Sequence, residues 1–292
     1  MKLSQFYDHV VKLGSDRDPR HEKSKITSYG DTAILHGNPD IQVRKIMLGI
    51  DIEVGELLLA DRIRQRQGLD LVVSHHPEGK AYARLHEVMQ IQVDVLQKIG
   101  LDRIIAQKML DERKAEVARR ILPQNHTRPV DAARILDLPF MCMHTPADNH
   151  AFSFINSLME KKLPKTVQDI IEILKGVPEY KEAAKHNAGP RIIVGNPKRC
   201  VGKILVEMTG GTEGPKDIFD KLYKAGVRTL ISMHLSEEHF KRVLDANLSV
   251  VIAGHISSDN LGINLLLDRI EKEAKQKLQI ISCSGFNRIT RN

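Results

Sequence analysis

The sequence predicts an α/β protein with two α/β lobes that face each other and a helical insertion in the middle. Short apolar runs alternate with amphipathic segments of helical length in the first 77 residues. The same alternation begins again after residue 190, while residues 82–136 show mainly helical spacing. Strand, helix, strand alternation is typical of parallel sheets covered by helices, which is why we expect a sheet in each lobe.

The first lobe is expected to cover approximately residues 1–176. Its apolar periodicity predicts, in chain order, helix 2–13, strands 33–36 and 45–50, helix 54–67, strand 71–74, helices 82–99, 101–121 and 130–136, strand 140–143, and helices 151–161 and 167–174.

The polar stretch 178–190 is expected to be irregular and to form the boundary between the lobes. The second lobe then covers approximately residues 190–292, and both lobes together make one unit. Its expected elements are strands 191–194 and 203–208, helix 215–225, strand 229–232, helix 237–246, strand 249–253, helix 259–273 and strand 278–283.

Composition excludes several classes of protein. Hydrophobic residues make up 41% of the chain, which is enough for a sizeable core, and charged residues make up 28%. The net charge of +7 is a weak signal for anionic partners, and aromatic residues total only 4%, so nucleic acid is an unlikely partner. The densest basic stretch, 113–120, alternates with Glu112 and Glu116 and is typical of a solvated helix face.

Targeting signals and disulfides are not expected. Cys142, Cys200 and Cys283 are far apart and odd in number, which favours a reducing compartment. The N-terminal segment lacks the apolar run of a signal peptide, and no window approaches a membrane span. We therefore expect a cytoplasmic protein without membrane contact.

Metal-capable side chains follow three of the expected strands. In an open α/β sheet, ligands bind beyond the carboxyl ends of the strands, so residues at these ends are candidates for one site. The residues in this position are His75, His76, His144, Asp148, His255 and Asp259.

Two neighbouring histidines follow strand 71–74. Inside a strand their side chains would diverge, but where the backbone turns, before Pro77, two imidazoles could serve two neighbouring metals. Two partly exposed loop histidines are the alternative.

The pair His255 and Asp259 is spaced i, i+4 at an expected helix start, which places both on one helix face. Alternatively, Ser257 or Ser258 caps the helix, and Asp259 is a first-turn acid favoured by the helix dipole.

His144 and Asp148 have the same spacing, and an Asp carboxylate can bridge two ions. A mixed set of imidazoles and carboxylates suits zinc, iron, manganese, nickel or cobalt. His234 and His239 follow another strand end and are more typical of near-site or surface histidines.

Three motifs, LVVSHHP, HTPAD and VIAGHISSD, occur in this order, each after an expected strand. They resemble those of the NIF-three-like dinuclear-metal family, also described as type 2 homologues of GTP cyclohydrolase I. The resemblance covers most of the chain and is strongest at residues 43–77 and 226–275. It implies two α/β lobes around a dinuclear metal centre, and subunits that commonly assemble into hexameric rings.

The resemblance also implies the ligand set: His75, His76, Asp148 as a bridging ligand, His255 and Asp259. His144 and His234 are near-site candidates. Asp259 stands where the family usually has glutamate, and HTPADNHAF lacks the residues that usually surround the aspartate in the middle motif. About thirty extra residues between His76 and His144 could form a lid, an assembly contact or a partner surface.

The sequence leaves two main functions open. The first is a metal-dependent hydrolase of a phosphate- or nucleotide-like small molecule, which two divalent ions and the nearby Lys80 and Arg84 would suit. The second is a non-catalytic metal-binding assembly or regulatory protein. An open coordination position facing a pocket would distinguish them, because catalytic sites need one.

Overall fold

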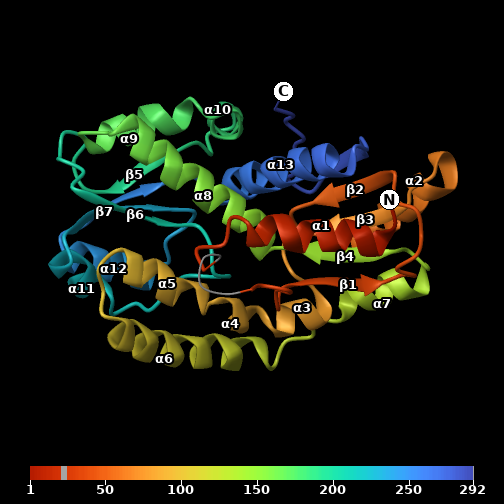
Figure 1. Ribbon diagram of the computed structural model, residues 1–292, viewed down its shortest axis with the longest axis horizontal. Helices are drawn as coiled ribbons and strands as arrows, with labels where there is room; N and C mark the ends of the chain where they lie inside the picture. Colours follow the sequence, from red (N-terminus) through yellow and green to blue (C-terminus); the bar gives the residue numbers. More distant parts are fainter. Residues whose placement is uncertain (21–24, 292) are drawn as a thin grey trace.

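The strands of the protein form two separate sheets. The computed structural model describes residues 1–20 and 25–291. The first sheet has the strand order β1-β4-β3-β2-β9 and the second has the order β5-β8-β7-β6. Figure 1 shows the sheets in opposite halves of the molecule, with α8 and α13 passing through the middle. The predicted two-lobed α/β fold is confirmed.

The elements of the chain have the following bounds: α1 (Leu3–Ser15), β1 (Thr32–His36), β2 (Lys45–Gly49), α2 (Val54–Gln67), β3 (Leu71–Ser74), α3 (Gly79–Ala83), α4 (Leu85–Val88), α5 (Ile91–Lys98), α6 (Arg103–Ile121), α7 (Arg128–Ile135), β4 (Phe140–Met143), α8 (Thr145–Lys162), α9 (Val167–Lys175), α10 (Pro178–Lys185), β5 (Arg191–Val194), β6 (Lys203–Glu207), α11 (Phe219–Lys224), β7 (Val227–Ser232), α12 (Glu237–Asp245), β8 (Ser249–Ile252), α13 (His255–Ala274) and β9 (Gln279–Cys283).

The expected strands are all present, but several helices differ. The helices expected over 151–161 and 259–273 begin earlier, at Thr145 and His255. The segment 82–99 is divided among α3, α4 and α5 rather than forming one helix. The helix expected over 215–225 is shorter and begins at Phe219. The stretch 178–190, expected to be irregular, contains α10, because Pro178 is tolerated in a first helical turn and Tyr180 is completely buried.

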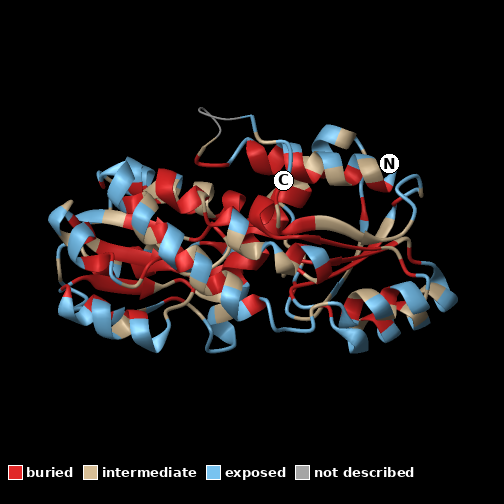
Figure 2. Cartoon of the chain, turned by 90° about the horizontal axis from the view of Figure 1, so that it is seen from below, coloured by how far each residue is buried: buried red, intermediate tan, exposed pale blue. Residues whose placement is uncertain are grey.

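The inner strands of each sheet are buried on both faces, and Figure 2 shows them in red, whereas the edge strands β1, β5 and β9 are partly exposed. In lobe one, Ile46 and Leu48 of β2 face a core with α1, α8 and α13. Met47, between them, faces the opposite core with α2 and α7. Successive side chains of a strand point to opposite faces, so continuous apolar runs produce a three-layer arrangement.

In lobe two, Leu230 of β7 packs into a core with α5, α6, α11 and α12. Ile231 faces the opposite core, which contains α8, α9, α10 and Leu261 of α13. The basic segment 113–120 is therefore only half solvated: Val117 is buried, while Arg119 and Arg120 are exposed.

Three segments cross the expected lobe boundary. Strand β9 pairs with β2 in parallel, so residues 279–283 complete the sheet of lobe one although they follow lobe two in sequence. The insertion helices α5 and α6 pack on the core of lobe two, as do α9 and α10 on its other face. Periodicity predicts elements but carries no information on which sheet a distant strand joins.

Helices α8 and α13 cross closely and connect the lobes. A Cβ atom at Gly262 of α13 would lie 2.3 Å from the carbonyl oxygen of Ala147 in α8, so only glycine permits this approach. The ligand candidates Asp148 and Asp259 lie near the starts of these two helices. The crossing therefore brings their carboxylates together.

None of the helices in residues 1–20 and 25–291 has the length and apolar character needed to cross a membrane.

Candidate metal centre

The two sheets direct the carboxyl ends of their parallel strands toward one site. Strands β2, β3 and β4 run parallel in lobe one, and β6, β7 and β8 do so in lobe two. Backbone hydrogen bonds from His75 to the Gly49 carbonyl and from His76 to the Ile50 carbonyl, both 2.9 Å, continue the pairing with β2 past the end of β3. Both imidazoles lie at the same site, since His75 and His76 share one group of potential ligands.

The five predicted ligands lie together with His144. Three groups each have ligand atoms within 4.8 Å of one another: His75, His76 and His144; His76, His255 and Asp259; and His75, Asp148 and Asp259. Asp148 Oδ1 lies 3.4 Å from His75 Nε2 and Oδ2 lies 3.6 Å from His144 Nε2.

Asp259 is the centre of the cluster. Its Oδ1 lies 3.5 Å from His75 Nε2. Its Oδ2 lies 3.6 Å from the Nε2 of His76 and 3.7 Å from that of His255. Asp259 is 1% exposed, so its carboxylate is almost fully removed from water. It belongs to two of the three groups, whereas the resemblance gave the bridging position to Asp148.

Several buried polar atoms of the cluster have no hydrogen-bond partner: His75 Nε2, Asp148 Oδ1 and Asp259 Oδ2. Buried polar groups are normally paired, and leaving them unpaired costs free energy. A divalent cation would satisfy these atoms at once, and imidazole with carboxylate is a donor set that transition metals accept. The residues present therefore fit a metal site.

Three imidazoles each donate a hydrogen bond from Nδ1 to an oxygen on the side away from the candidate metal site. His75 Nδ1 donates to the Met143 carbonyl (3.1 Å), His76 Nδ1 to Asp51 (2.6 Å) and His144 Nδ1 to Asp31 (2.8 Å). Such acceptors keep the proton on Nδ1 and leave the lone pair of Nε2 directed at the site. This is the usual arrangement of metal-binding histidines, and it places His144 among the candidate ligands.

Sequence reasoning missed Asp31 and Asp51. Asp51 follows the end of β2, so the strand-end rule that singled out the other ligands could have found it. Asp31 precedes β1, and it reaches His144 only because β1 is antiparallel to β4, with Thr32 opposite Met143. The sequence gives no signal for that reversed direction.

The imidazoles and carboxylates of the cluster shift the pKa values of one another. Although burial opposes the charged form, the carboxylates of Asp259 and Asp148 raise the pKa of His75 to about 10. Burial likewise opposes the charge of His76, whose pKa is raised to about 9 by the nearby carboxylates of Asp259 and Asp51. Burial disfavours the charged form of Asp259, but His75 and His76 lower its pKa. The carboxylates thus favour positive charge in the cluster, which a bound cation would also supply.

His255 differs from the other histidines of the cluster. Burial lowers its pKa, with Asp259 opposing the shift. Its side chain is 41% exposed and lines a small, open cavity. The cavity lies over Asp148 and Asp259, so the site is accessible from one side.

The remainder of the cavity wall comes from the ends of β6 and β7 and from the loop after β6, and its lining residues are Glu207, Met208, Thr209, Gly211, Thr212, Glu213, Ser232, Met233 and His234. No lysine or arginine of the described residues lines it. Lys80 and Arg84, which the sequence suggested as phosphate contacts, lie elsewhere, and Arg84 pairs with Glu87 at 2.8 Å. Positive charge at the cavity would therefore come from its histidines or from bound metal.

His234 lies at the cavity, as expected for a near-site residue. Its ring centroid is 4.9 Å from that of His255, and its Nδ1 is 3.5 Å from Glu213. His239 is held inside the loop instead, with Nε2 donating to the Gly214 carbonyl at 3.0 Å. Burial opposes ionisation of Glu213, but hydrogen bonds from His234 and the Ser236 amide lower its pKa to about 2.

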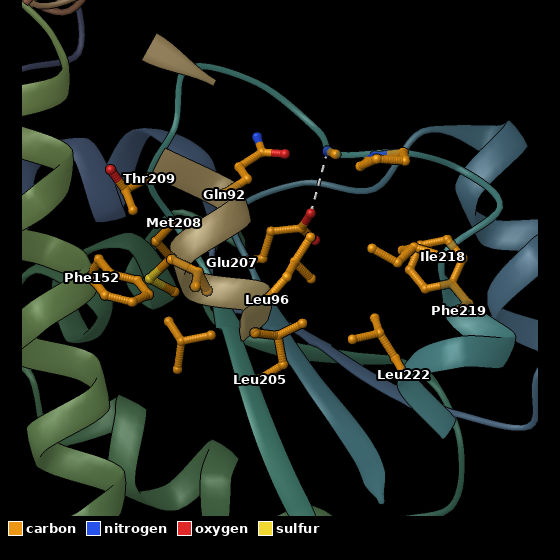
Figure 3. A pocket seen from close by; sticks show the side chains of 14 residues that line it. Gln92, Leu96, Phe152, Leu205, Glu207, Met208, Thr209, Ile218, Phe219 and Leu222 are labelled. Carbon is orange, nitrogen blue, oxygen red and sulfur yellow. Dashed lines mark hydrogen bonds between the residues drawn. The ribbon is translucent and has the colours of Figure 1, made fainter. Parts of the chain in front are cut away.

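Glu207, also missed by sequence reasoning, separates this cavity from a second, apolar pocket. Figure 3 shows its carboxylate between Gln92 and the apolar side chains of Leu96, Leu205 and Ile218. Burial raises the pKa of Glu207, and the dashed line marks the Gly214 amide, 3.4 Å from Oε1. Its place at the end of β6 is the signal that could have found it.

Comparison with solved structures identifies similar folds. The chain is 26% identical to a NIF3 superfamily protein from Sphaerobacter thermophilus, with a TM-score of 0.79 and coverage of 94% of this chain and 97% of that one. Reduced HcgD from Methanocaldococcus jannaschii is 15% identical with a TM-score of 0.57, and 97% of each chain is covered. Protein ybgI, of unknown function, is 15% identical with a TM-score of 0.55, and coverage is 97% of this chain and 98% of that one.

No family model matches the sequence, and no curated protein matches it. Fold and site together define a two-lobed α/β protein with histidines and aspartates gathered between its sheets. Its similarity in fold to a NIF3 superfamily protein, at 26% identity over 94% of the chain, supports the NIF3-like family. The resemblance drawn from its three strand-end motifs is thereby confirmed.

Proposed function

We propose that this protein is a metal-dependent hydrolase that acts on a small phosphate- or nucleotide-like molecule with two divalent ions. The convergence of unpaired, buried ligand atoms beneath an accessible cavity carries the proposal. A site that only stabilises a fold is closed by its ligands, whereas a catalytic site keeps a position for water or substrate.

The geometry supports two neighbouring subsites. His76, His255 and Asp259 would hold one ion, and His75, Asp148 and Asp259 the other. Asp259 would be shared between them, and His144, 3.6 Å from Asp148, would complete the second subsite. Zinc, iron, manganese, nickel and cobalt all accept this set of imidazoles and carboxylates.

Bound ions would supply Lewis acidity and a water of lowered pKa. The chain itself supplies orientation: Asp31, Asp51 and the Met143 carbonyl fix three imidazoles so that their Nε2 atoms face the site. Because no lysine or arginine of the described residues lines the cavity, a phosphate would be held by the ions, by His234 and by the hydroxyl group of Thr212.

The test is elemental analysis of the purified protein, followed by removal of metal, reloading with each of the five metals, and a screen of phosphoesters and nucleotides. We expect about two ions per chain, because six candidate ligands exceed what one four-coordinate ion uses. Turnover should depend on metal and should be lost in the double variant His75→Ala, His76→Ala. If that variant keeps its full metal content, the site assignment is wrong.

A second candidate function is a metal-binding assembly or regulatory protein without turnover. The absence of lysine and arginine from the described cavity wall favours it, since anionic substrates are usually met by such groups. Two ions per chain with no hydrolysis of any phosphate compound would support this candidate over the first.

Assembly and location complete the proposal. We place the protein in the cytoplasm, in accordance with three cysteines that form no disulfide among themselves. We also propose a homo-oligomer, with a hexameric ring as the expected form. Exposed apolar side chains such as Leu58 and Leu59 of α2 support an assembly contact, and light scattering of the purified protein measures its size.

A further inference from the structure

The loop over residues 209–215, here called the 209–215 loop, forms one wall of the cavity above the candidate metal centre. Its sequence is TGGTEGP, and Gly210 and Gly211 have φ angles of +92° and +82°. A Cβ atom at Gly210 would lie 2.8 Å from Gln92, and one at Gly211 would lie 2.9 Å from Val88. The glycines therefore let the loop lie directly against helices α4 and α5.

Two polar side chains of the helical insertion hold this loop. Gln92 Nε2 donates to the carbonyls of Gly210 (3.1 Å) and Thr212 (2.7 Å). Arg113 Nε, from α6, donates to the carbonyl of Glu213 at 3.1 Å. Three carbonyl groups of the loop thus accept hydrogen bonds from residues that are more than ninety positions away in sequence.

Both side chains are buried, and Arg113 also pairs with Glu116 through Nη1 at 2.9 Å. Gln92 is 6% exposed and Arg113 is 9% exposed, beside the core formed by Val93, Leu110 and their neighbours. Placing an amide and a guanidinium there costs free energy unless their donors are used. An apolar residue would fill the same space at lower cost, so packing alone does not account for these two residues.

The 209–215 loop contacts the candidate metal site through Glu213 and His234. Glu213 accepts a hydrogen bond from the Ser236 amide, and its carboxylate lies 3.5 Å from His234 Nδ1 and 3.4 Å from His239 Nδ1. His234 in turn packs its ring on that of the candidate ligand His255, with centroids 4.9 Å apart. A displacement of the loop backbone would therefore move His234 relative to the open side of the centre.

We propose that Gln92 and Arg113 are positioning residues, through which the helical insertion fixes the 209–215 loop and sets His234 to contact the phosphate-like ligand over the metal centre. The substrate class rests on the proposed function, but the positioning of the loop does not. The extra helices are then neither a lid nor a partner surface alone: they brace the substrate side of the cavity.

The experiment uses the full chain with Gln92→Met and Arg113→Met, which keep length and remove the donors, and Arg113→Lys as the conservative variant. Arg119→Met is the matched control, because Arg119 is exposed on the same helix. Backbone hydrogen exchange, read by mass spectrometry, reports on the loop without metal or substrate. Inorganic phosphate is the probe for the metal-loaded protein, and metal content is measured for each variant.

We expect amide exchange in residues 210–214 and at Ser236 to become about five- to tenfold faster in both Met variants, with α6 still protected, which corresponds to the loss of one or two hydrogen bonds. Metal content should stay unchanged, while phosphate should bind about five- to tenfold more weakly. Combination with His234→Asn should add no further loss, since residues acting through one another are not additive. Arg113→Lys should recover part of the affinity, and Arg119→Met should match the parent chain.

Unchanged exchange in the 209–215 loop would overturn the proposal, as would a faster-exchanging loop with full phosphate affinity, or losses that simply add to that of His234→Asn. Faster exchange throughout α6 would show a general packing defect and would also count against it, provided that Arg113→Lys behaves alike. If phosphate does not bind the metal-loaded parent chain, the proposed function fails, and the exchange data alone decide whether the insertion positions the loop.

Discussion

Replacement of Asp259 by asparagine removes a charge from the centre of the cluster without changing the size of the side chain. Asp259 lies 3.5–3.7 Å from three imidazoles and is the first cause, after opposing burial, of the raised pKa of His75. A pKa of about 10 against an ordinary 6.5 corresponds to about 5 kcal/mol in favour of the charged imidazole, shared by Asp259 and Asp148. The attraction between the Asp259 carboxylate and a cation bound at this position is therefore expected to be strong.

We expect Asp259→Asn to weaken the binding of at least one ion about a hundredfold or more, because loss of mere support for a metal ligand already costs ten- to a hundredfold. Competition with a chelator, followed by elemental analysis, measures the change. Asp245→Asn is the control, since Asp245 is an exposed residue of α12. Asp259→Glu should retain binding within about tenfold, because the carboxylate remains and the family usually has glutamate there.

Equal metal affinity in Asp259→Asn and the parent chain would refute this reasoning. Asp259 would then be only an acid near the start of α13, and the centre would rest on the other ligand candidates.

Three further outcomes are expected. Metal affinity should increase between pH 6 and pH 9, by up to about tenfold per unit for each proton displaced, because protons on His75 (pKa about 10) and His76 (pKa about 9) compete with the ion; a dissociation constant that ignores pH would contradict this. Burial, with the charge of Arg269, lowers the pKa of His150 to about 4, so the folded state excludes a proton that the unfolded chain binds. The stability from this group is complete above pH 6.5 and is lost as pH falls toward 4, by about 3 kcal/mol in all, which urea unfolding at pH 7 and pH 5 would reveal in comparison with His150→Asn. Leu110→Ala should lower the free energy of unfolding by about 2–5 kcal/mol while metal content is retained, because Leu110 of the insertion is completely buried in the core of lobe two; an unchanged unfolding midpoint would show that the insertion is dispensable for that core.

The local spacing of apolar residues predicted most of the helices and strands. Strands β3 and β4 have the bounds that apolar runs predict, because they are buried on both faces and are followed by polar residues. The division of 82–99 into short helices was not predictable, since the apolar spacing there continues across the breaks. Membership of β9 in the first sheet depends on a pairing with β2 across more than two hundred residues.

The ligand candidates were found from sequence because each follows a strand end, a property that neighbouring residues reveal. The residues that orient them were not, because Asp31 reaches His144 through an antiparallel pairing and Arg113 reaches the cavity through the packing of α6 on lobe two. Residue type and spacing identify side chains that bind. Side chains that hold others in place depend on contacts between distant segments.

The return of the chain to its first sheet has a consequence for synthesis of the protein on the ribosome. Strand β2 pairs with β3 on one side and with β9 on the other, and β9 is made more than two hundred residues after β2. While residues 50–278 emerge, one edge of β2 has no partner strand, although His75 and His76 are already present. The centre needs Asp259 as well, so metal loading belongs to the completed chain, and a prematurely terminated product would expose an unpaired strand edge that favours aggregation.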